Sequence, residues 1–329
     1  MKESFADLGR VRALEKLYEG TPFRPFAGVS FVPKDGARVV SSSRTFIEGI
    51  DFNLVYFPLK HLGGKCVTAV SGALCAAFAR PRTLTVRLGI SAKLDIEQIG
   101  GLWSGMAATA REDGYEAVDL DLVPSPNGLT VSVSATGETV LQTAAPQSKD
   151  VLCISGRLGS AYLGLQVLER ESRQFDASGS QPSLEKYRMM IGAYLHPELD
   201  ASVPEKLAAA GITPTGGWWV TRGLADAVRT AARDTGLGAK VYADRIPFEG
   251  NSFGLGRELG LDTISAAMNG GDDFRLLLSV PILQAETFRR DFQTFDIIGH
   301  LALPEAGTVL VAPDGMEFPM KAQGWENPE

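Results

Sequence analysis

The apolar and polar positions of the chain follow two periods, one typical of strands and one typical of helices. Arg82–Ser91 alternates apolar and polar residues, which predicts a strand with one apolar face. His61–Ala79 is a run of small and apolar residues, which predicts a helix buried against a sheet. Phe46–Tyr56 is an apolar segment in which we expect strand structure. Further strands are predicted at Ala37–Ser43, Val118–Leu122, Leu129–Thr136, Val151–Ser155, Ala239–Tyr242, Phe274–Val280 and Thr308–Ala312, and further helices at Ile96–Gly114, Ser160–Glu171, Pro204–Ala210, Leu224–Thr235 and Ala285–Phe292.

A polar segment divides these elements into two halves. Gln142–Asp150 carries Pro146 and has no apolar period, so we expect a domain boundary there. The length of 329 residues also exceeds what one hydrophobic core usually supports. The pattern therefore predicts an α/β (α+β) protein with domains at 1–145 and 146–329.

The second half opens with a strand, a glycine turn and a helix. Val151–Ser155 is followed by Gly156, Gly159 and the helix that begins at Ser160. Such a turn can offer backbone N–H groups to an anion. Its spacing matches neither a Walker loop nor a dinucleotide fingerprint, so this signal alone is weak.

Composition and charge narrow the class of protein. The chain is 44% hydrophobic and 22% charged, as globular proteins are. Its formal net charge of −7 disfavours nucleic acid and anionic membrane as partners. The three cysteines lack CxxC spacing and are expected to be reduced thiols. Met1–Gly20 has a helical pattern with no signal peptide, and no apolar run could span a bilayer, so we expect a cytoplasmic protein.

Several short phrases, taken together and in order, resemble one family. They are Phe46-Ile47-Glu48-Gly49-Ile50-Asp51-Phe52, Pro58–Gly63, Ile154–Gly159, Asn269-Gly270-Gly271-Asp272-Asp273-Phe274, Ile298–His300 and Lys321–Trp325. This set is similar to the thiamine-monophosphate kinases of the aminoimidazole-ribonucleotide-synthetase superfamily, over nearly the whole chain. The resemblance implies an N-terminal domain whose sheet forms a homodimer and a C-terminal α/β domain, with ATP at the junction.

The family reaction transfers the γ-phosphoryl group of ATP to thiamine monophosphate, with several Mg²⁺ ions between the phosphates. Positioning and charge neutralisation dominate such a reaction, and Mg²⁺ prefers carboxylate ligands. The resemblance places Asp51, Asp272 and Trp325 at the substrate. It places Asp35 and Asp121 at positions equivalent to metal ligands.

The chain departs from the family pattern at most of the acidic positions. Asp51 stands where the family has a histidine. The acidic residues that the family uses for metal ions are replaced by Gly36, Arg44, Gly72, Trp219 and Arg222. Two of these replacements are cations, which cannot hold Mg²⁺ but can bind phosphate in a bidentate manner. We therefore predict that Arg44, Gly156 and Arg222 bind a nucleotide or another small phosphorylated ligand.

Three functions are compatible with this pattern. One is a divergent kinase that uses Asp35, Asp121 and Asp272 with fewer metal ions. The second is a catalytically inactive paralogue that binds a ligand or regulates another protein. The third is a different ATP-dependent reaction on the same scaffold. The loss of carboxylates predicts weak or absent phosphoryl transfer and weak binding of Mg·ATP.

Overall fold

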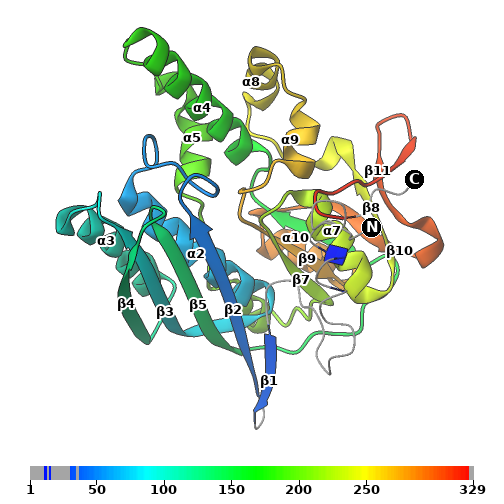
Figure 1. Ribbon diagram of the computed structural model, residues 1–329. Coiled ribbons are helices and arrows are strands. Elements are labelled where there is room, and N and C mark those ends of the chain that lie inside the picture. Colours follow the sequence, from blue (N-terminus) through cyan, green and yellow to red (C-terminus); the bar gives the residue numbers. More distant parts are fainter. Residues whose placement is uncertain (1–10, 13–14, 16–29, 35–36, 326–329) are drawn as a thin grey trace, which may run out of the picture.

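The computed structural model describes residues 11–12, 15, 30–34 and 37–325. Within them the chain forms two sheets, with the long helices packed beside them (Figure 1). The first sheet comprises β1 (Ser30–Lys34), β2 (Ala37–Ile47), β3 (Ala79–Ser91), β4 (Ala117–Ser125) and β5 (Thr130–Thr139). The second comprises β6 (Val151–Ser155), β7 (Gly216–Val220), β8 (Gly238–Tyr242), β9 (Arg275–Val280), β10 (Phe295–Ala302), β11 (Thr308–Val311) and β12 (Glu317–Pro319).

The helices fall mainly in the connections between these strands. They are α2 (Leu59–Ala76), α3 (Ile96–Glu112), α4 (Ser160–Ser178), α5 (Arg188–Leu195), α6 (Val203–Ala209), α7 (Leu224–Thr235), α8 (Ser252–Leu259), α9 (Thr263–Asn269) and α10 (Ala285–Asp291). Short 3-10 turns lie at η1 (Glu185–Tyr187), η2 (Ala243–Arg245), η3 (Ile282–Gln284) and η4 (Pro304–Ala306). The predicted mixed α/β class is confirmed by this arrangement.

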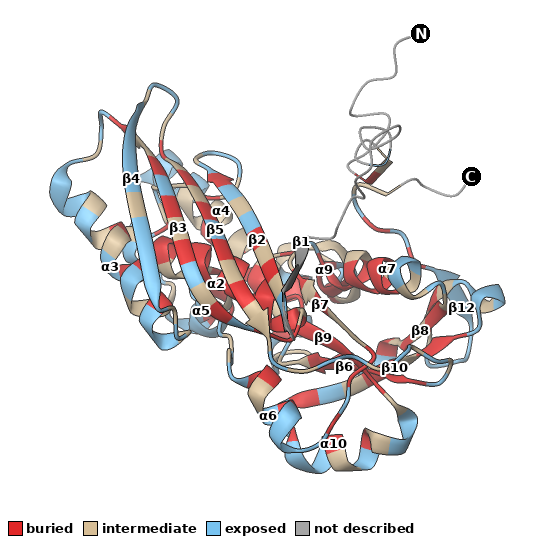
Figure 2. Ribbon diagram, turned by 90° about the horizontal axis from the view of Figure 1, so that it is seen from below, coloured by how far each residue is buried: buried red, intermediate tan, exposed pale blue. Residues whose placement is uncertain are grey.

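The first sheet has the strand order β1-β2-β5-β3-β4. Its pairs are antiparallel except for β3 and β4, which run parallel. The predicted alternation of β3 is confirmed, because Leu84, Val86 and Leu88 are all buried beneath α2 and α3. β4 is the edge strand and is exposed along almost its whole length (Figure 2).

The second sheet has the order β12-β11-β8-β10-β6-β9-β7 and uses residues after position 150. α7 covers one face, where Leu224 and Val228 pack on Val241 and Ile298. α6 and α10 cover the other face. The strands of the two sheets are thus drawn from either side of the predicted boundary segment.

α2 connects the two halves of the structure. Its buried residues belong to the core of the first sheet, while Cys75 and Ala76 at its end join the core beneath β9. This helix is almost completely buried from Leu62 to Ala76, as its small and apolar composition predicts. The helix therefore contacts both sheets, β2, β3 and β5 of the first and β7 and β9 of the second.

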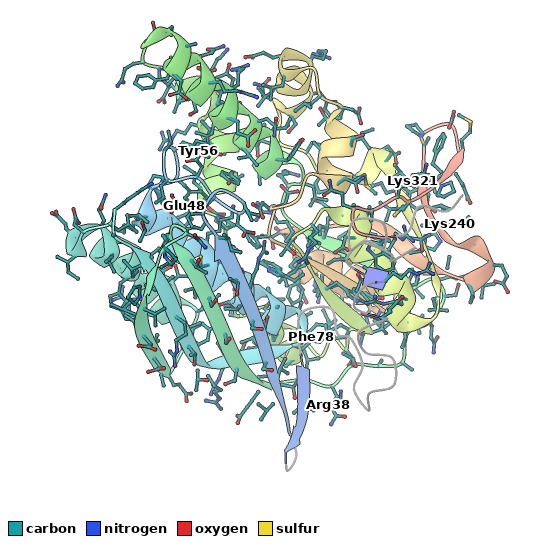
Figure 3. All side chains as sticks on the ribbon, viewed as in Figure 1. Arg38, Glu48, Tyr56, Phe78, Lys240 and Lys321 are labelled. Atoms are coloured by element: carbon teal, nitrogen blue, oxygen red, sulfur yellow. The ribbon has the colours of Figure 1, made fainter. Side chains whose placement is uncertain are left out.

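The segment after β2 differs from the extended structure expected through Tyr56. β2 ends at Ile47, and residues 48–58 form turns instead. A side-chain hydrogen bond takes part in ending the strand. Glu48 Oε2 accepts the backbone N–H of Leu129 at 2.7 Å, in the place of a backbone carbonyl of β2. The resulting loop extends from the end of the sheet toward α5, as Glu48 and Tyr56 show in Figure 3.

None of the described helices is both long and apolar enough to span a membrane.

Candidate functional site

A cavity of about 460 Å³ lies where the two halves meet. Its walls come from the loop 49–56, from α4 and α5, and from the turns 221–222 and 269–272. The lining is mostly polar and includes three acidic residues, Asp51, Glu169 and Asp272, and one arginine, Arg222. Its volume is in the range of small-molecule sites.

The loop 49–56 holds Asp51 by its own backbone contacts. Asp51 Oδ2 accepts the backbone N–H of Ile47 at 2.9 Å, and Gly49 N–H donates to the carbonyl of Phe52 at 2.8 Å. Gly49 has φ +81°, a conformation that glycine adopts without strain. Asp51 and Tyr56 therefore reach the same cavity from one tight loop.

Tyr56 and Glu169 meet on this side of the cavity. Burial and the neighbouring Glu169 carboxylate together raise the pKa of Tyr56, so the phenol stays protonated at neutral pH. Its hydroxyl is therefore available as a hydrogen-bond donor to a ligand.

The turn before β9 is unusual in its backbone. Asp272 and Phe274 have φ of +62° and +49°, and Gly271 between Gly270 and Asp272 has φ +82°. Left-handed backbone is costly for a residue such as Phe274 and is often found at functional sites. The backbone N–H of Asp272 donates to the carbonyl of Thr221 at 2.9 Å, which fixes this turn beside Arg222.

Asp272 binds two cations of the chain. Its Oδ2 is 3.0 Å from Lys65 Nζ, and its Oδ1 is 3.9 Å from Arg44 Nη2. Lys65 is only 2% exposed and also donates to the carbonyl of Tyr194 at 3.0 Å. Burial lowers the pKa of Lys65, and Asp272 opposes that shift. The carboxylate and its two partners form a compact charge cluster at the wall of the cavity.

Lys65 was missed by sequence reasoning. It is the only charged residue between His61 and Ala79, inside a segment expected to be a buried helix. A lysine at such a position is rarely buried without a partner. That isolation was the available signal, although it does not name Asp272, which is 207 residues away in sequence.

The neighbouring Asp273 points to a different element. It is 3% exposed and accepts the backbone N–H groups of Gly159 at 2.7 Å and Ala161 at 3.2 Å, at the start of α4. Burial raises the pKa of Asp273 to about 7, against the opposite effect of these two N–H donors. Donors of the predicted anion-binding turn are thus already used by a carboxylate of the chain itself. Gly156 lies against Arg275 and does not line the cavity.

Gly72 and Trp219, which stand at two positions where the resemblance implies a carboxylate, lie in contact. A Cβ atom added to Gly72 would lie 2.1 Å from the Trp219 ring. The ring also stacks on Phe274, with centroids 5.7 Å apart and an angle of 25° between the planes. An aromatic side chain therefore fills the space that a side chain at position 72 would need.

The other predicted site residues have separate positions. Asp121 lies on β4, with a side chain 63% exposed that pairs with Arg87 at 3.9 Å, and it does not line the cavity. Trp325 packs on α7, where its Nε1 donates to Asp226 at 2.8 Å and its ring lies 4.6 Å from the Arg229 guanidinium. Asp35 lies outside the described residues. The structure thus brings Asp51, Asp272 and Arg222 to the cavity and joins Arg44 to Asp272.

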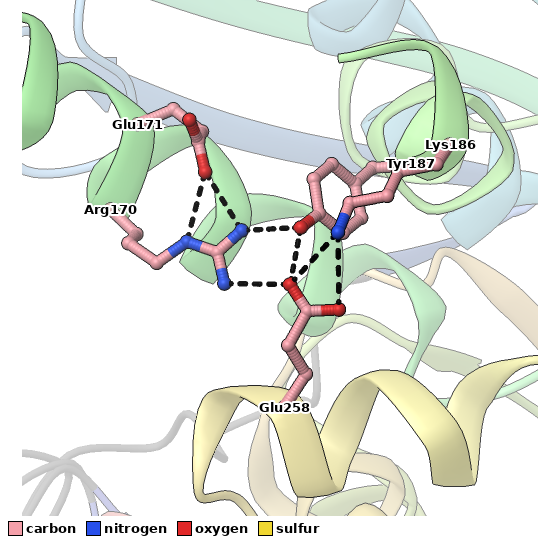
Figure 4. A network of polar contacts seen from close by, with 5 residues as sticks. All are labelled: Arg170, Glu171, Lys186, Tyr187 and Glu258. Atoms are coloured by element: carbon pink, nitrogen blue, oxygen red, sulfur yellow. Dashed lines mark hydrogen bonds and ion pairs between the residues drawn. The ribbon is translucent and has the colours of Figure 1, made fainter. Parts of the chain in front are cut away.

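A polar network fixes the α4 wall from outside (Figure 4). Arg170 on α4 donates to Glu171 at 2.7 Å and to Glu258 of α8 at 3.0 Å. Tyr187 also donates to Glu258, and Lys186 lies 3.3 Å from the same carboxylate. This network ties α4, η1 and α8 together one residue beyond Glu169, which lines the cavity.

The comparisons with known proteins point to one fold family. A scan against protein-family models finds no match. The thiamine-monophosphate kinase of Bacillus subtilis is 21% identical over 310 residues, which cover 90% of each chain. The carbamoyl dehydratase HypE of Azotobacter vinelandii is 27% identical over 241 residues, covering 70% of this chain and 65% of that protein. AaThiL complexed with AMPPCP and TMP superposes with a TM-score of 0.83 and 17% identity, covering 99% of each chain.

The chain is similar in sequence to thiamine-monophosphate kinases along most of its length and shares the fold of AaThiL. The expected resemblance and fold are confirmed at this level.

The residues of this site do not fit the magnesium site that the resemblance implies. Among the described residues, no group of three or more carboxylate, histidine or cysteine side chains could hold a metal ion. Asp272 is bound by Lys65 and Arg44, and aromatic carbon lies next to Gly72. Mg²⁺ requires several oxygen ligands in a strict octahedral arrangement. Asp272 is thus paired with cations, and the Trp219 indole ring covers Gly72, so neither position supplies a free oxygen ligand.

Proposed function

We propose that this thiamine-monophosphate kinase relative binds a small phosphorylated molecule in the cavity and transfers phosphoryl groups weakly or not at all. The contact between Gly72 and Trp219 carries the proposal, because it fills with an aromatic ring the space for a side chain at a former carboxylate position. Without metal ions, the phosphate charges of ATP and of an acceptor phosphate would repel each other at the distance of reaction.

Thiamine monophosphate is the first ligand to test. AaThiL was crystallised with TMP and with AMPPCP, and this chain shares its fold. Arg222 supplies a guanidinium for a phosphate group, while Asp51, Glu169 and the Tyr56 hydroxyl supply hydrogen-bond partners for the rest of a ligand. A binding or regulatory protein would need to recognise the ligand in this way but would not need to transfer a phosphoryl group.

A different reaction on the same scaffold is the second candidate function. The similarity to the carbamoyl dehydratase HypE favours this candidate, because that protein is named for a reaction other than phosphoryl transfer to thiamine monophosphate. Asp51 and Tyr56, which line the cavity, would then bind a substrate other than thiamine monophosphate.

We expect the purified chain to show weak binding of Mg·ATP and no more than trace formation of thiamine diphosphate. The physical reason is that the described residues hold no group of three or more side chains placed to bind a metal ion, and that Asp272 is already paired with Lys65 and Arg44. Calorimetry with Mg·ATP, then with thiamine monophosphate, and a turnover assay measure both quantities. The thiamine-monophosphate kinase of Bacillus subtilis serves as the positive control. Tight Mg²⁺-dependent ATP binding with turnover comparable to that control would reject the proposal.

We also propose a cytoplasmic homodimer formed through the first sheet. β4 has an unpaired edge and exposes Val118, Leu122 and Val123, a combination that invites association. The three cysteines are free thiols, the state that a reducing compartment maintains.

Sedimentation equilibrium at micromolar concentration should therefore give twice the mass of the chain. Leu122→Lys should weaken the dimer by about tenfold or more, because it places a charge on an apolar edge. Ile282→Lys is the matched control, since Ile282 is similarly exposed on η3, in the other half of the chain. A monomeric parent protein, or equal effects of the two substitutions, would contradict this interface.

A further inference from the structure

The charge cluster at the cavity wall is built from three distant parts of the chain. Lys65 comes from α2, Arg44 from β2 and Asp272 from the left-handed turn before β9. Two cations and one carboxylate leave a net charge of +1. Arg222 stands on the neighbouring turn and lines the same cavity, where Asp51 and Glu169 supply two further carboxylates, so three cations stand against three carboxylates around the cavity.

The Lys65 ammonium is held permanently in this cluster. Its Nζ lies 3.8 Å from the Tyr194 ring centroid, 5.3 Å from that of Phe57 and 5.6 Å from that of Phe274. Aromatic faces attract a cation most strongly where water is excluded. The hydrogen bonds to Asp272 and to the Tyr194 carbonyl complete its coordination. Because the ammonium is fully buried, it cannot turn out to solvent and release Asp272.

A divalent cation would have to compete with this ammonium. To bind Asp272, the metal ion would need to separate the Lys65 pair and leave the ammonium buried without its anion, which is strongly unfavourable. Arg44 adds a second positive charge at 3.9 Å from the same carboxylate, and its guanidinium is fixed over the Phe46 and Phe274 rings. Asp272 is therefore committed to cations of the chain.

We propose that Lys65 and Arg44 replace a divalent cation at this site, and that the cavity binds the phosphate group of its ligand without any metal ion. The inference rests on the proposed function and specifies how it works. Arg222 in the cavity lining offers the paired donors of a guanidinium to a phosphate group, while the buried Lys65 acts through its charge and its hold on Asp272. The ligand class is a small phosphate monoester, and inorganic phosphate shares its charged group.

Binding of inorganic phosphate and of thiamine monophosphate should be independent of magnesium. Calorimetric titrations in EDTA and in excess Mg²⁺ are expected to give dissociation constants that agree within about twofold. Affinity should fall as salt is added, because the charges are partly exposed. An increase of about tenfold or more on adding Mg²⁺, or no detectable binding of either probe in EDTA, would overturn the inference.

Substitutions that remove a cation from the cluster should lower phosphate affinity, and a substitution that removes its carboxylate should raise it. Lys65→Met and Arg44→Gln each remove one cation while Asp272 keeps the other partner, and each should weaken binding by about tenfold. Asp272→Asn removes the carboxylate and should strengthen binding. Lys240→Met is the matched control, because Lys240 pairs with Glu317 on β12, outside the cavity lining. Equal affinity in the parent and both cation variants would overturn the inference.

Folding and catalysis are tested separately in the same proteins. Urea unfolding of each variant shows whether Lys65→Met is folded, and Arg44→Gln repeats the test on a side chain that is 24% exposed. Transfer of phosphate from Mg·ATP in the turnover assay would reject the proposed function. If no phosphate is transferred but phosphate binding depends on magnesium, the proposed function stands and only the proposal that Lys65 and Arg44 replace a divalent cation is rejected.

Discussion

Asp272→Asn is expected to lower the free energy of unfolding by about 3–5 kcal/mol at pH 7, because removal of one partner leaves a buried ion uncompensated. The uncompensated ion is the Lys65 ammonium, whose side chain is 2% exposed. Asparagine is the suitable replacement, since it tolerates the left-handed backbone that Asp272 adopts at φ +62°. The loss therefore reports on charge and not on backbone strain.

The size of this loss should depend on pH. Burial lowers the pKa of Lys65 in the folded state, and without Asp272 the pKa falls further. Between the lowered folded value and the ordinary value of about 10.4, the unfolded chain binds more protons, so stability rises with pH. Asp272→Asn should accordingly be less destabilising at pH 9 than at pH 7. Urea unfolding at both values measures the difference.

Two further variants make this result decisive. The double variant Lys65→Met, Asp272→Asn should recover most of the loss, because it leaves no buried charge without a partner. Asp296→Asn removes a surface carboxylate that pairs with Arg157 at 3.7 Å and should change stability by about 0.5 kcal/mol or less. A loss near that of Asp296→Asn, or one that is the same at pH 7 and pH 9, would show that Asp272 does not compensate Lys65.

The elements with a strong period could be predicted from sequence. α7 has the predicted bounds, Leu224–Thr235, because its apolar stripe is complete. β3 begins three residues before the predicted strand. β7, Gly216–Val220, and the short helices α8 and α9 escaped prediction, since stretches of five to eight residues carry too little of any period. They form only because larger elements offer a surface to pack on.

The lining of the candidate cavity was predicted in part. Asp51, Asp272 and Arg222 were selected from their places in the family pattern, and they line one cavity. The charge pair of Asp272 with Lys65 depends on how α2 passes between the sheets, which no local pattern contains. Trp325 lies on α7 because the Asp226 carboxylate and the Arg229 guanidinium hold its indole there. Tertiary packing determines which residues contact Asp272 and Trp325, and the local sequence does not contain that information.

The contact between Gly72 and Trp219 also gives a test of the proposed absence of a metal site. It joins residues 147 positions apart, each of which stands where the resemblance implies a carboxylate. If the indole ring occupies the space of the former side chain, each position should determine what the other tolerates. A double-mutant cycle measures that dependence directly.

Gly72→Ala should destabilise the parent protein by about 2–3 kcal/mol, because the new Cβ overlaps the Trp219 ring and overpacking costs more than the helix gains from alanine. Trp219→Ala should cost about 3–5 kcal/mol through the cavity it leaves.

In the Trp219→Ala background, Gly72→Ala should stabilise the protein instead of destabilising it. The new methyl group then enters empty space, and the helix α2 gains up to about 1 kcal/mol from replacing glycine. Gly100→Ala is the matched control, since a Cβ at Gly100 of α3 meets no atom within 4 Å, and it should be mildly stabilising in both backgrounds. Urea unfolding of the parent protein, the single variants and the double variants gives the coupling free energy between the two positions. If Gly72→Ala has the same effect with and without the indole ring, Trp219 does not fill the space of the lost carboxylate, and the argument for an aromatic replacement of the metal site fails.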